Sequence, residues 1–225
     1  MPQEQAENFL INPPGRLVYT DSLIAPKAFR SKDGAGGLPR YNCQVLIAET
    51  NPVIPQLQAL ILKIAAEKFA PRDVRTLKLP LKSGISLNGE RVTQGKQPLD
   101  FYPGNFVLFA QKPEKSRAGA LLTPPGLKVL QGGKPVDYSN RRDLAKSFFY
   151  NGVLAAVSVQ FKDFSGFGGG ITCYLDRVLS MNSGDLINVG RSDEDVFGSA
   201  DSYAEYVGTI SAESVLGGTV VQGPW

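Results

Sequence analysis

The stretch GVLAAVSVQFKDFSGFGGGITCYLDRVLSM, residues 152–181, holds the two clearest strand patterns in the chain. Apolar and polar residues alternate before and after a glycine-rich segment at 165–169, which is typical of two β-strands joined by a hairpin loop. A phosphate-binding glycine loop leads into a helix, whereas ITCYL at 171–175 has the pattern of a strand. The stretch therefore predicts strands over 152–164 and 170–181, and it carries no nucleotide-hydrolase motif.

Earlier parts of the chain add shorter strand patterns. Residues 40–48 alternate cleanly between apolar and polar side chains, and residues 16–19 and 106–110 have shorter runs that favour strands. Two further short strands are expected around 77–81 and 85–87. The sequence contains 24 glycines and 16 prolines, which favours many turns and short strands over a helical bundle.

One long helix is predicted over about 52–69. Asn51 is a suitable N-cap, prolines in the first turn cost little, and apolar residues recur at near-helical spacing until Pro71 ends the pattern. Residues 112–151 are broken by prolines and glycines and are expected to form a long excursion without regular structure. About five strands, one capping helix and long loops predict a mainly β fold, a five-stranded barrel of the oligonucleotide/oligosaccharide-binding type, or OB-fold. A β-sandwich is the alternative, because periodicity does not separate the two architectures.

The charge distribution divides the chain into parts. Residues 1–15, which end in Pro-Pro-Gly, are predicted to be a flexible N-terminal arm, and residues 16–190 to be the OB-fold domain. Residues 191–225 are predicted to be a flexible acidic C-terminal tail, because six carboxylates and one base give it a net charge of −5. The whole chain carries +3, so residues 1–190 carry +8. A basic body with an acidic tail favours a polyanionic partner, and a solvated surface with a solubilising tail is the alternative interpretation.

Several classes of function are disfavoured by what the sequence lacks. It contains no histidine, the commonest general base and metal ligand, so the chain is predicted to be no enzyme and to use no metal or cofactor. Cys43 and Cys173 lie in strand patterns and are interpreted as small buried apolar residues, with a disulfide or metal pair as the alternative. No apolar run approaches the ~18 residues of a membrane span, and residues 1–10 lack the pattern of a signal peptide, so a cytoplasmic protein is expected.

Basic and aromatic residues interleave in NFVLFAQKPEKSRAG, residues 105–119, where a short strand leads directly into a cluster of positive charge. Single-stranded nucleic acid presents base faces that stack on aromatic rings and phosphates that bind Lys and Arg, so a groove for it needs both. Some of the rings are expected to serve the core instead. Alternation does not determine which of Phe106 and Phe109 faces outward, and only one of them is expected to do so. The predicted DNA-binding residues are Arg40, Tyr41, Tyr102, Phe106, Phe109, Lys112, Lys115, Arg117, Arg141, Arg142, Tyr150, Gln160 and Lys162.

Six stretches of the chain, taken in order, resemble the sequence of a known family. They are GRLVYTDSLIAPKAF (15–29), RYNCQVLIAE (40–49), LKLPLKSG (77–84), NFVLFAQKPEK (105–115), NGVLAAVSVQFKDF (151–164) and VGRSDEDVFG (189–198). Over about residues 15–198 the chain resembles the OB-fold single-stranded DNA-binding proteins of tailed bacteriophages. The resemblance implies a five-stranded barrel that coats and protects single-stranded DNA in phage replication and recombination, without sequence preference. It places DNA contacts around residues 106–117 and 160–164.

The resemblance also bears on the tail. Related phage proteins often end in a dense acidic run with a terminal aromatic residue, whereas here the acids are spread out and only the terminal aromatic is matched. The −5 charge of the tail predicts instead that it competes with DNA for the basic body and, once displaced, contacts phage replication proteins, with a disordered solubilising tail as the alternative. The tail residues expected to do so are Asp193, Glu194, Asp195 and Trp225. A virion structural or assembly protein is the alternative function, and such a protein would self-assemble and be indifferent to DNA.

Overall fold

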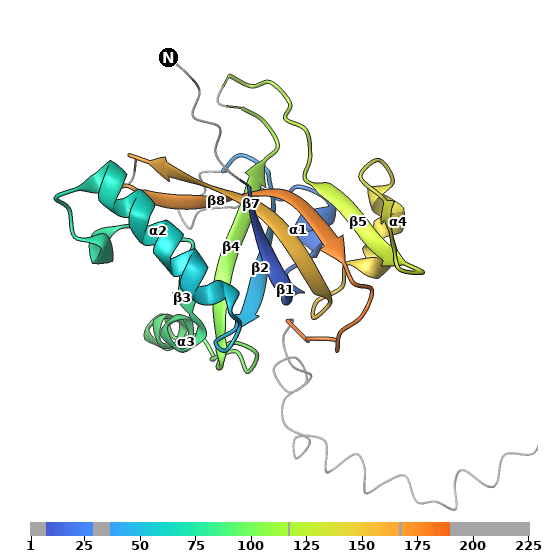
Figure 1. Ribbon diagram of the computed structural model, residues 1–225, viewed down its shortest axis with the longest axis horizontal. Helices are drawn as coiled ribbons and strands as arrows, with labels where there is room; N and C mark the ends of the chain where they lie inside the picture. Colours follow the sequence, from blue (N-terminus) through green and yellow to red (C-terminus); the bar gives the residue numbers. More distant parts are fainter. Residues whose placement is uncertain (1–7, 29–36, 117, 167, 190–225) are drawn as a thin grey trace, which may run out of the picture. The chain divides into compact units, whose positions relative to one another are not determined.

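The structure is a computed structural model, and it describes residues 8–28, 37–116, 118–166 and 168–189. The chain divides into two units after Ile187, and the fold described below belongs to the first. The fold is mainly β, with an eight-stranded sheet and several helices (Figure 1). The strands are β1 (Phe9–Val18), β2 (Arg40–Ala48), β3 (Leu81–Ser83), β4 (Asn105–Pro113), β5 (Gly126–Gln131), β6 (Lys134–Asp137), β7 (Leu154–Phe164) and β8 (Gly170–Ser180). The α-helices are α1 (Asp21–Ile24), α2 (Val53–Phe69), α3 (Gly84–Thr93) and α4 (Arg142–Ala145), and the 3-10 helices are η1 (Val74–Thr76) and η2 (Lys146–Phe148).

The strand pairing closes part of the sheet on itself. The order is β3-β4-β2-β1-β7-β8-β5-β6, and a further parallel pairing joins β4 to β8, at Ala110 with Cys173 and at Gln111 with Tyr174. The strands β1, β2, β4, β8 and β7 therefore form a ring of five. The β5–β6 hairpin continues from β8 outside this ring, and β3 pairs with β4.

The core lies inside the ring. Successive residues of a strand point to opposite faces, and the inward-facing residues are buried, among them Val45, Leu108 and Val157. The helix α2 adds buried side chains of its own, including Leu57 and Ile61. Because alternate residues of the ring strands belong to the core, the residues between them form an outer surface on the same strands.

The two cysteines lie in this core as free thiols, on strands that flank Ala110 of β4. Burial raises the pKa of the Cys43 thiol to about 12 and that of the Cys173 thiol well above its ordinary value. Both thiols therefore stay protonated at neutral pH and pack as small apolar side chains. The prediction that they are small buried residues is confirmed.

Most of the long elements agree with the sequence patterns. The helix predicted at about 52–69 is confirmed as α2, and the strands predicted at 40–48, 152–164 and 170–181 are confirmed as β2, β7 and β8. The Asn51 side chain accepts a hydrogen bond from the first backbone N–H of α2 at 3.0 Å, which satisfies one of the donors that a helix leaves free at its start.

The strand predicted around 85–87 is wrong, because these residues belong to α3. Three alternating residues carry no periodicity that separates a strand from one turn of a helix. The strand expected around 77–81 is reduced to an isolated pairing of Lys78 with Gly170, and β3 begins only at Leu81. Gly84 marks the turn from β3 into α3, where a Cβ atom would clash with the Tyr102 backbone.

The excursion predicted at 112–151 also contains regular structure, namely the β5–β6 hairpin and α4. The hairpin turn is formed by Gly132 and Gly133, whose φ angles of 55° and 77° are those of a two-residue turn that needs glycine. The expectation of five strands and one helix therefore counts too few of each. The Gly-Gly pair between two short apolar runs was the sequence signal for this hairpin.

The first strand is longer than its pattern indicated. β1 spans Phe9–Val18, so residues 9–15 belong to a strand and not to an N-terminal arm. Its pairing with β7 shifts register between Ile11 and Gly15, and the two prolines lie within this irregular section. A strand tolerates proline at such a bulge because no ladder hydrogen bond is required there.

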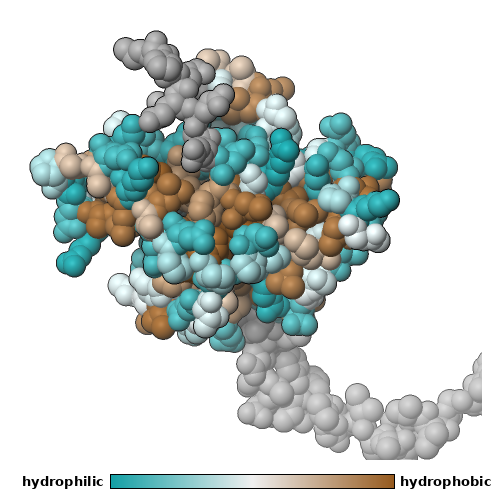
Figure 2. Space-filling view, viewed as in Figure 1, coloured by the Kyte–Doolittle hydropathy of each residue, from teal (hydrophilic) through white to brown (hydrophobic). Residues whose placement is uncertain are grey.

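The outer surface of the molecule is mixed in character. On the face drawn in Figure 2, hydrophobic side chains gather in a band across the molecule, with hydrophilic side chains on both sides. Exposed apolar side chains of the described residues include Leu38, Leu121 and Leu186. The surface therefore offers apolar as well as charged area for contacts.

Candidate nucleic-acid interface

A groove lies on the outer face of the ring where β2 and β4 pair. Asn42 and Gln44 of β2 face outward beside Gln111 and Phe109 of β4, because their neighbours in each strand point into the core. These four side chains form the floor of a cavity of about 830 Å³, named the first groove below. A surface of amides and one aromatic ring suits a ligand with both polar edges and flat apolar faces.

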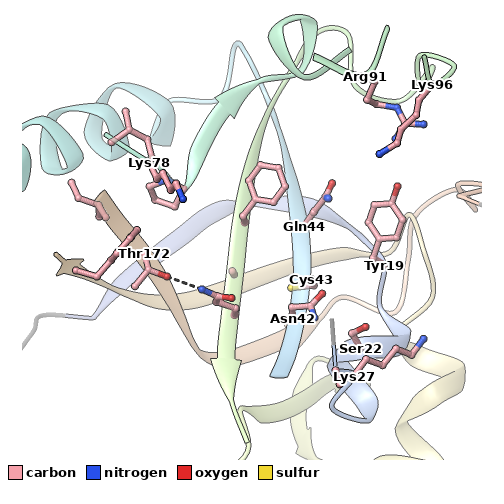
Figure 3. Close-up of a pocket in the computed structure, with 18 residues that line it drawn as sticks. Tyr19, Ser22, Lys27, Asn42, Cys43, Gln44, Lys78, Arg91, Lys96 and Thr172 are labelled. Atoms are coloured by element: carbon pink, nitrogen blue, oxygen red, sulfur yellow. Dashed lines mark hydrogen bonds between the residues drawn. The ribbon is translucent and has the colours of Figure 1, made fainter. Parts of the chain in front are cut away.

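Positive charge surrounds this floor. Lys27, Lys78, Arg91 and Lys96 line the first groove, and none of its described lining residues is a carboxylate. Figure 3 shows Arg91 and Lys96 together at one side, Lys78 at another and Lys27 at the far end, with β2 between them. A concave surface lined by one sign of charge concentrates the field and attracts a polyanion.

Three aromatic residues also line the first groove, namely Tyr19, Phe109 and Phe164. Tyr19 lies between β1 and α1 with a φ of 59°, in the left-handed region that residues other than glycine seldom occupy. Such a conformation persists only where the surrounding structure holds it, and it is found preferentially at functional sites. Asn182, which does not line this groove, has a similar φ of 53°, so the conformation of Tyr19 fixes its position at the end of β1 but does not by itself mark a functional site.

Hydrogen bonds order the polar part of the floor. Arg40 Nη1 donates to Gln111 Oε1 at 2.8 Å, and Gln111 Nε2 donates to Thr172 Oγ1 at 2.9 Å, which is the dashed line in Figure 3. Arginine can only donate, so the contact with Arg40 determines which way the Gln111 amide points. Beside it, Asn42 Nδ2 is buried without a partner among the described residues.

Three aromatic predictions are separated by the geometry of this region. Phe109 lines the first groove, whereas Phe106 packs against the core, so the outward member of the pair is Phe109. Tyr102 is only 4% exposed, and its hydroxyl donates to Gln44 Oε1 at 2.8 Å. Burial is the main cause that raises the pKa of Tyr102 to about 12. Tyr102 therefore supports the floor from below, where a base cannot reach its ring face.

Arg142 and Tyr41 form a structural contact at the other end of β2. The Arg142 guanidinium donates to the carbonyl oxygens of Leu23, Ile24 and Pro125 at 2.6, 3.1 and 2.8 Å, and lies 4.8 Å from the centroid of the Tyr41 ring. Tyr41 is only 8% exposed. Because these contacts engage both the guanidinium and the ring, we do not expect either residue to bind DNA.

Lys112 and Lys115 lie beyond the first groove. Lys112 follows Gln111 on β4 and so faces the opposite side from the groove floor. Burial is the main cause that lowers the pKa of Lys112, opposed by the charge of Asp176 and reinforced by those of Arg142 and Arg177. Lys115 is exposed after β4, where it pairs with Leu121. The strand and its basic continuation therefore present their charges to different surfaces.

Arg141 and Tyr150 also make their contacts with residues that do not form the floor of the first groove. The Arg141 guanidinium lies 5.3 Å from the centroid of the Tyr138 ring. The Tyr150 hydroxyl donates to the Gly184 carbonyl at 2.8 Å, and its ring packs against the core. Neither residue lines the first groove.

Gln160 and Lys162 lie on the outer face of β7, opposite Tyr174 and Thr172 of β8. The Lys162 ammonium lies 5.3 Å from the centroid of the Tyr174 ring, and Gln160 Nε2 donates to the Asn8 side chain at 2.8 Å. Thr172 is itself part of the first groove. Gln160 and Lys162 therefore lie on an outer surface that adjoins the groove.

Most of the charge around the groove was not assigned from the sequence. The charged and aromatic residues of the groove that the sequence analysis did not single out include Tyr19, Lys27, Lys78, Arg91 and Lys96, and the floor amides Asn42, Gln44 and Gln111 were not predicted either. The basic character of residues 72–99 was the available signal for three of them, but it carries no periodicity that selects individual side chains. Tyr19 left no signal, because its role depends on a backbone conformation at the end of a strand.

Five of the predicted residues lie outside the part of the chain that the structure describes, and two kinds of feature are absent from that part. Arg117, Asp193, Glu194, Asp195 and Trp225 lie outside the described residues. Within the described residues, no group of three or more Cys, Asp or Glu side chains is arranged to hold a metal ion. No helix in that part of the chain is long and apolar enough to cross a membrane.

Solved structures that share this fold include those of a bacteriophage single-stranded DNA-binding protein. The protein from bacteriophage Enc34, in complex with single-stranded DNA, matches with a TM-score of 0.58 and 16% identity over 83% of this chain and 91% of that chain. The same Enc34 protein in a second structure matches with a TM-score of 0.57 and 17% identity, over 88% of this chain and 91% of that chain. The predicted resemblance to this family is thus confirmed at the level of the fold.

Other comparisons add little to this result. The single-stranded DNA-binding protein gp2.5 of bacteriophage T7 matches with a TM-score of 0.45 and 11% identity, over 83% of this chain and 98% of that chain, which is too weak to carry a conclusion. No protein-family model matches the sequence, and no curated protein sequence matches it.

Proposed function

We propose that this chain is a single-stranded DNA-binding protein of a bacteriophage, which coats and protects DNA inside the host cell during replication and recombination and catalyses no reaction. The observation that carries the proposal is the first groove. Four Lys and Arg side chains, three aromatic rings and three side-chain amides line it, and none of its described lining residues is a carboxylate. The shared fold with phage single-stranded DNA-binding proteins supports it. In this proposal the five-stranded ring with α2 is an OB-fold barrel.

The mechanism combines stacking with charge neutralisation. Phe109 and Tyr19 stack successive bases, at roughly 1–3 kcal/mol for each base. Lys78, Arg91 and Lys96 contact the phosphates. Stacking accepts every base because every base has an apolar face, so binding is independent of sequence to a first approximation.

A salt titration tests the proposed function. Full-length protein is expected to bind labelled oligo-dT with log K falling against log salt at a slope of about −0.7 for each phosphate neutralised, so that a few contacts give a slope of a few units. Duplex DNA of the same length serves as the control and is expected to bind more weakly. A slope near zero, or no binding in low salt, would contradict the proposal, and self-assembly without DNA binding would favour a virion structural role.

The acidic tail is proposed to compete with DNA for the basic groove and, once displaced, to contact phage replication proteins. A segment tethered to its target has an effective concentration of the order of millimolar, so weak contacts with its −5 charge are sufficient. Removal of residues 191–225 is expected to tighten DNA binding at low salt and to extend it to duplex DNA. The effect should disappear at high salt because charges are then screened within a few ångströms. Equal affinities of the truncated and full-length chains at every salt concentration would leave the tail without a regulatory role.

A further inference from the structure

A second groove adjoins the first on the same side of β4. It has a volume of about 910 Å³ and is bounded by η1, β3 and α3. Four residues line both grooves, namely Lys78, Leu79, Arg91 and Phe109. The buried Tyr102 lines the second groove and donates its hydroxyl hydrogen bond to Gln44 in the floor of the first. The two cavities therefore meet around the Phe109 ring.

The second groove is also basic, but its charge is partly neutralised. Arg75 and Lys82 add to the shared Lys78 and Arg91, and Glu90 is the one carboxylate among the described residues that line it. The Glu90 carboxylate contacts the Lys82 ammonium at 2.8 and 3.0 Å through its two oxygens. In the first groove Lys27 is likewise paired, with Asp21 at 3.4 Å, but Asp21 does not itself line that groove.

The contact between Lys82 and Glu90 is one in which a DNA phosphate could replace the Glu90 carboxylate. The two side chains are 38% and 47% exposed, and ion pairs of this kind contribute little net stability because water screens them. A phosphate oxygen that replaced Glu90 would meet the same ammonium donor at the same kind of distance. The partly buried Leu81 side chain lines the same groove beside the Phe109 ring and adds some apolar character to it.

We propose that the second groove binds the nucleotides that follow those in the first, and that Glu90 occupies Lys82 until a DNA phosphate displaces it. This inference rests on the proposed function, because it extends the same single strand past Phe109. In consequence, long oligonucleotides use both grooves, and short ones bind to the first groove, which has the amide floor and three aromatic rings. Because DNA must displace the Glu90 carboxylate, its affinity for the second groove is lower than it would be for the same cations without Glu90.

The test is a length series of oligo-dT, from about 4 to about 16 nucleotides, the range that one OB-fold covers. Replacing Lys82 or Arg75 by alanine is expected to weaken binding of the long oligonucleotides about threefold to tenfold and to lower their salt slope by about 0.7, while the short ones bind as before. Replacing Lys96, which lines only the first groove, should weaken binding at every length. Lys63→Ala on α2, outside both grooves, is the matched control and should change neither.

The Glu90→Gln variant tests the displacement step separately. It should tighten binding of long oligonucleotides about threefold, the size expected when a partly exposed charge pair is removed, without affecting short ones. Glu67→Gln is its control, because Glu67 makes a comparable exposed pair with Lys63 at 3.9 Å outside both grooves. Affinity of Glu90→Gln equal to that of wild type at all lengths would show that Glu90 does not compete with DNA.

The outcomes separate this inference from the proposed function. If the wild-type protein binds no oligonucleotide of any length, the proposed function itself fails. If it binds, but the folded Lys82→Ala and Arg75→Ala variants lose affinity equally at all lengths or at none, the function stands and the second groove is not part of the DNA path.

Discussion

Replacing Phe109 by alanine is expected to weaken binding to single-stranded DNA by about fivefold to 150-fold, which corresponds to the 1–3 kcal/mol of one stacked base. Phe109 faces outward from β4 and lines both grooves, so its ring is available to a base and contributes little to the core. Because the ring carries no charge, the dependence of log K on log salt should keep its slope. No other single ring in the described residues lines both cavities.

Fluorescence anisotropy with labelled oligo-dT over a range of salt concentrations measures this effect. Phe109→Tyr preserves the aromatic face and should bind nearly as wild type does. Phe106→Ala is the matched control on the same strand, because Phe106 packs against the core. It should lower the free energy of unfolding by about 2–4 kcal/mol and leave the affinity of the folded protein unchanged. A folded Phe109→Ala protein with wild-type affinity would show that the strand does not stack bases.

Replacing Arg142 by alanine is expected to lower the free energy of unfolding by about 2–4 kcal/mol, because three partly buried carbonyls lose a charged donor at once. The change also removes the contact of the guanidinium with the buried Tyr41 ring. These contacts join α1, the segment before β5 and α4, so the loss affects the packing of three segments far apart in the sequence.

Urea denaturation of the variant and of wild type measures this loss, and DNA binding is then measured on the folded variant. Arg141→Ala is the matched control: Arg141 is the adjacent arginine, is exposed, and should change the free energy of unfolding by less than about 0.5 kcal/mol. The folded Arg142→Ala protein should bind oligo-dT as wild type does. Unchanged stability combined with weaker DNA binding would restore Arg142 to the DNA-binding residues and contradict the structural role.

The sequence predicted a basic and aromatic site but did not predict most of the residues that form it, and the position of the groove explains why. Alternating patterns are local, so β2, β7 and β8 could be assigned from the chain alone, together with α2. The pairing of β2 with β4 places Gln44 beside Phe109, residues that are far apart in the sequence. No local pattern predicts which strands become neighbours, and hence which outward-facing side chains share a surface.

The two adjacent arginines also show that a sequence pattern cannot determine which side chain is available to bind DNA. In the sequence Arg141 and Arg142 are equivalent, and both were predicted to bind phosphates. In the structure one is exposed and the other donates to three carbonyls. The difference arises because α4 packs near α1, which brings the carbonyls of Leu23 and Ile24 within reach of a single side chain.

By itself, the sequence determined the alternating strands and the long helix. It also determined the presence of a basic, histidine-free body and an acidic tail, because these depend only on residue type and spacing. The tertiary structure alone decided the closed ring, the outward orientation of Phe109 and the set of cations around the floor. Lys27, Lys78 and the neighbouring Arg91 and Lys96 come from three separate segments and meet only when β1, β2, β4 and α3 are in place. Charge type is a property of the residue, whereas the field of a groove is a property of how distant residues are brought together.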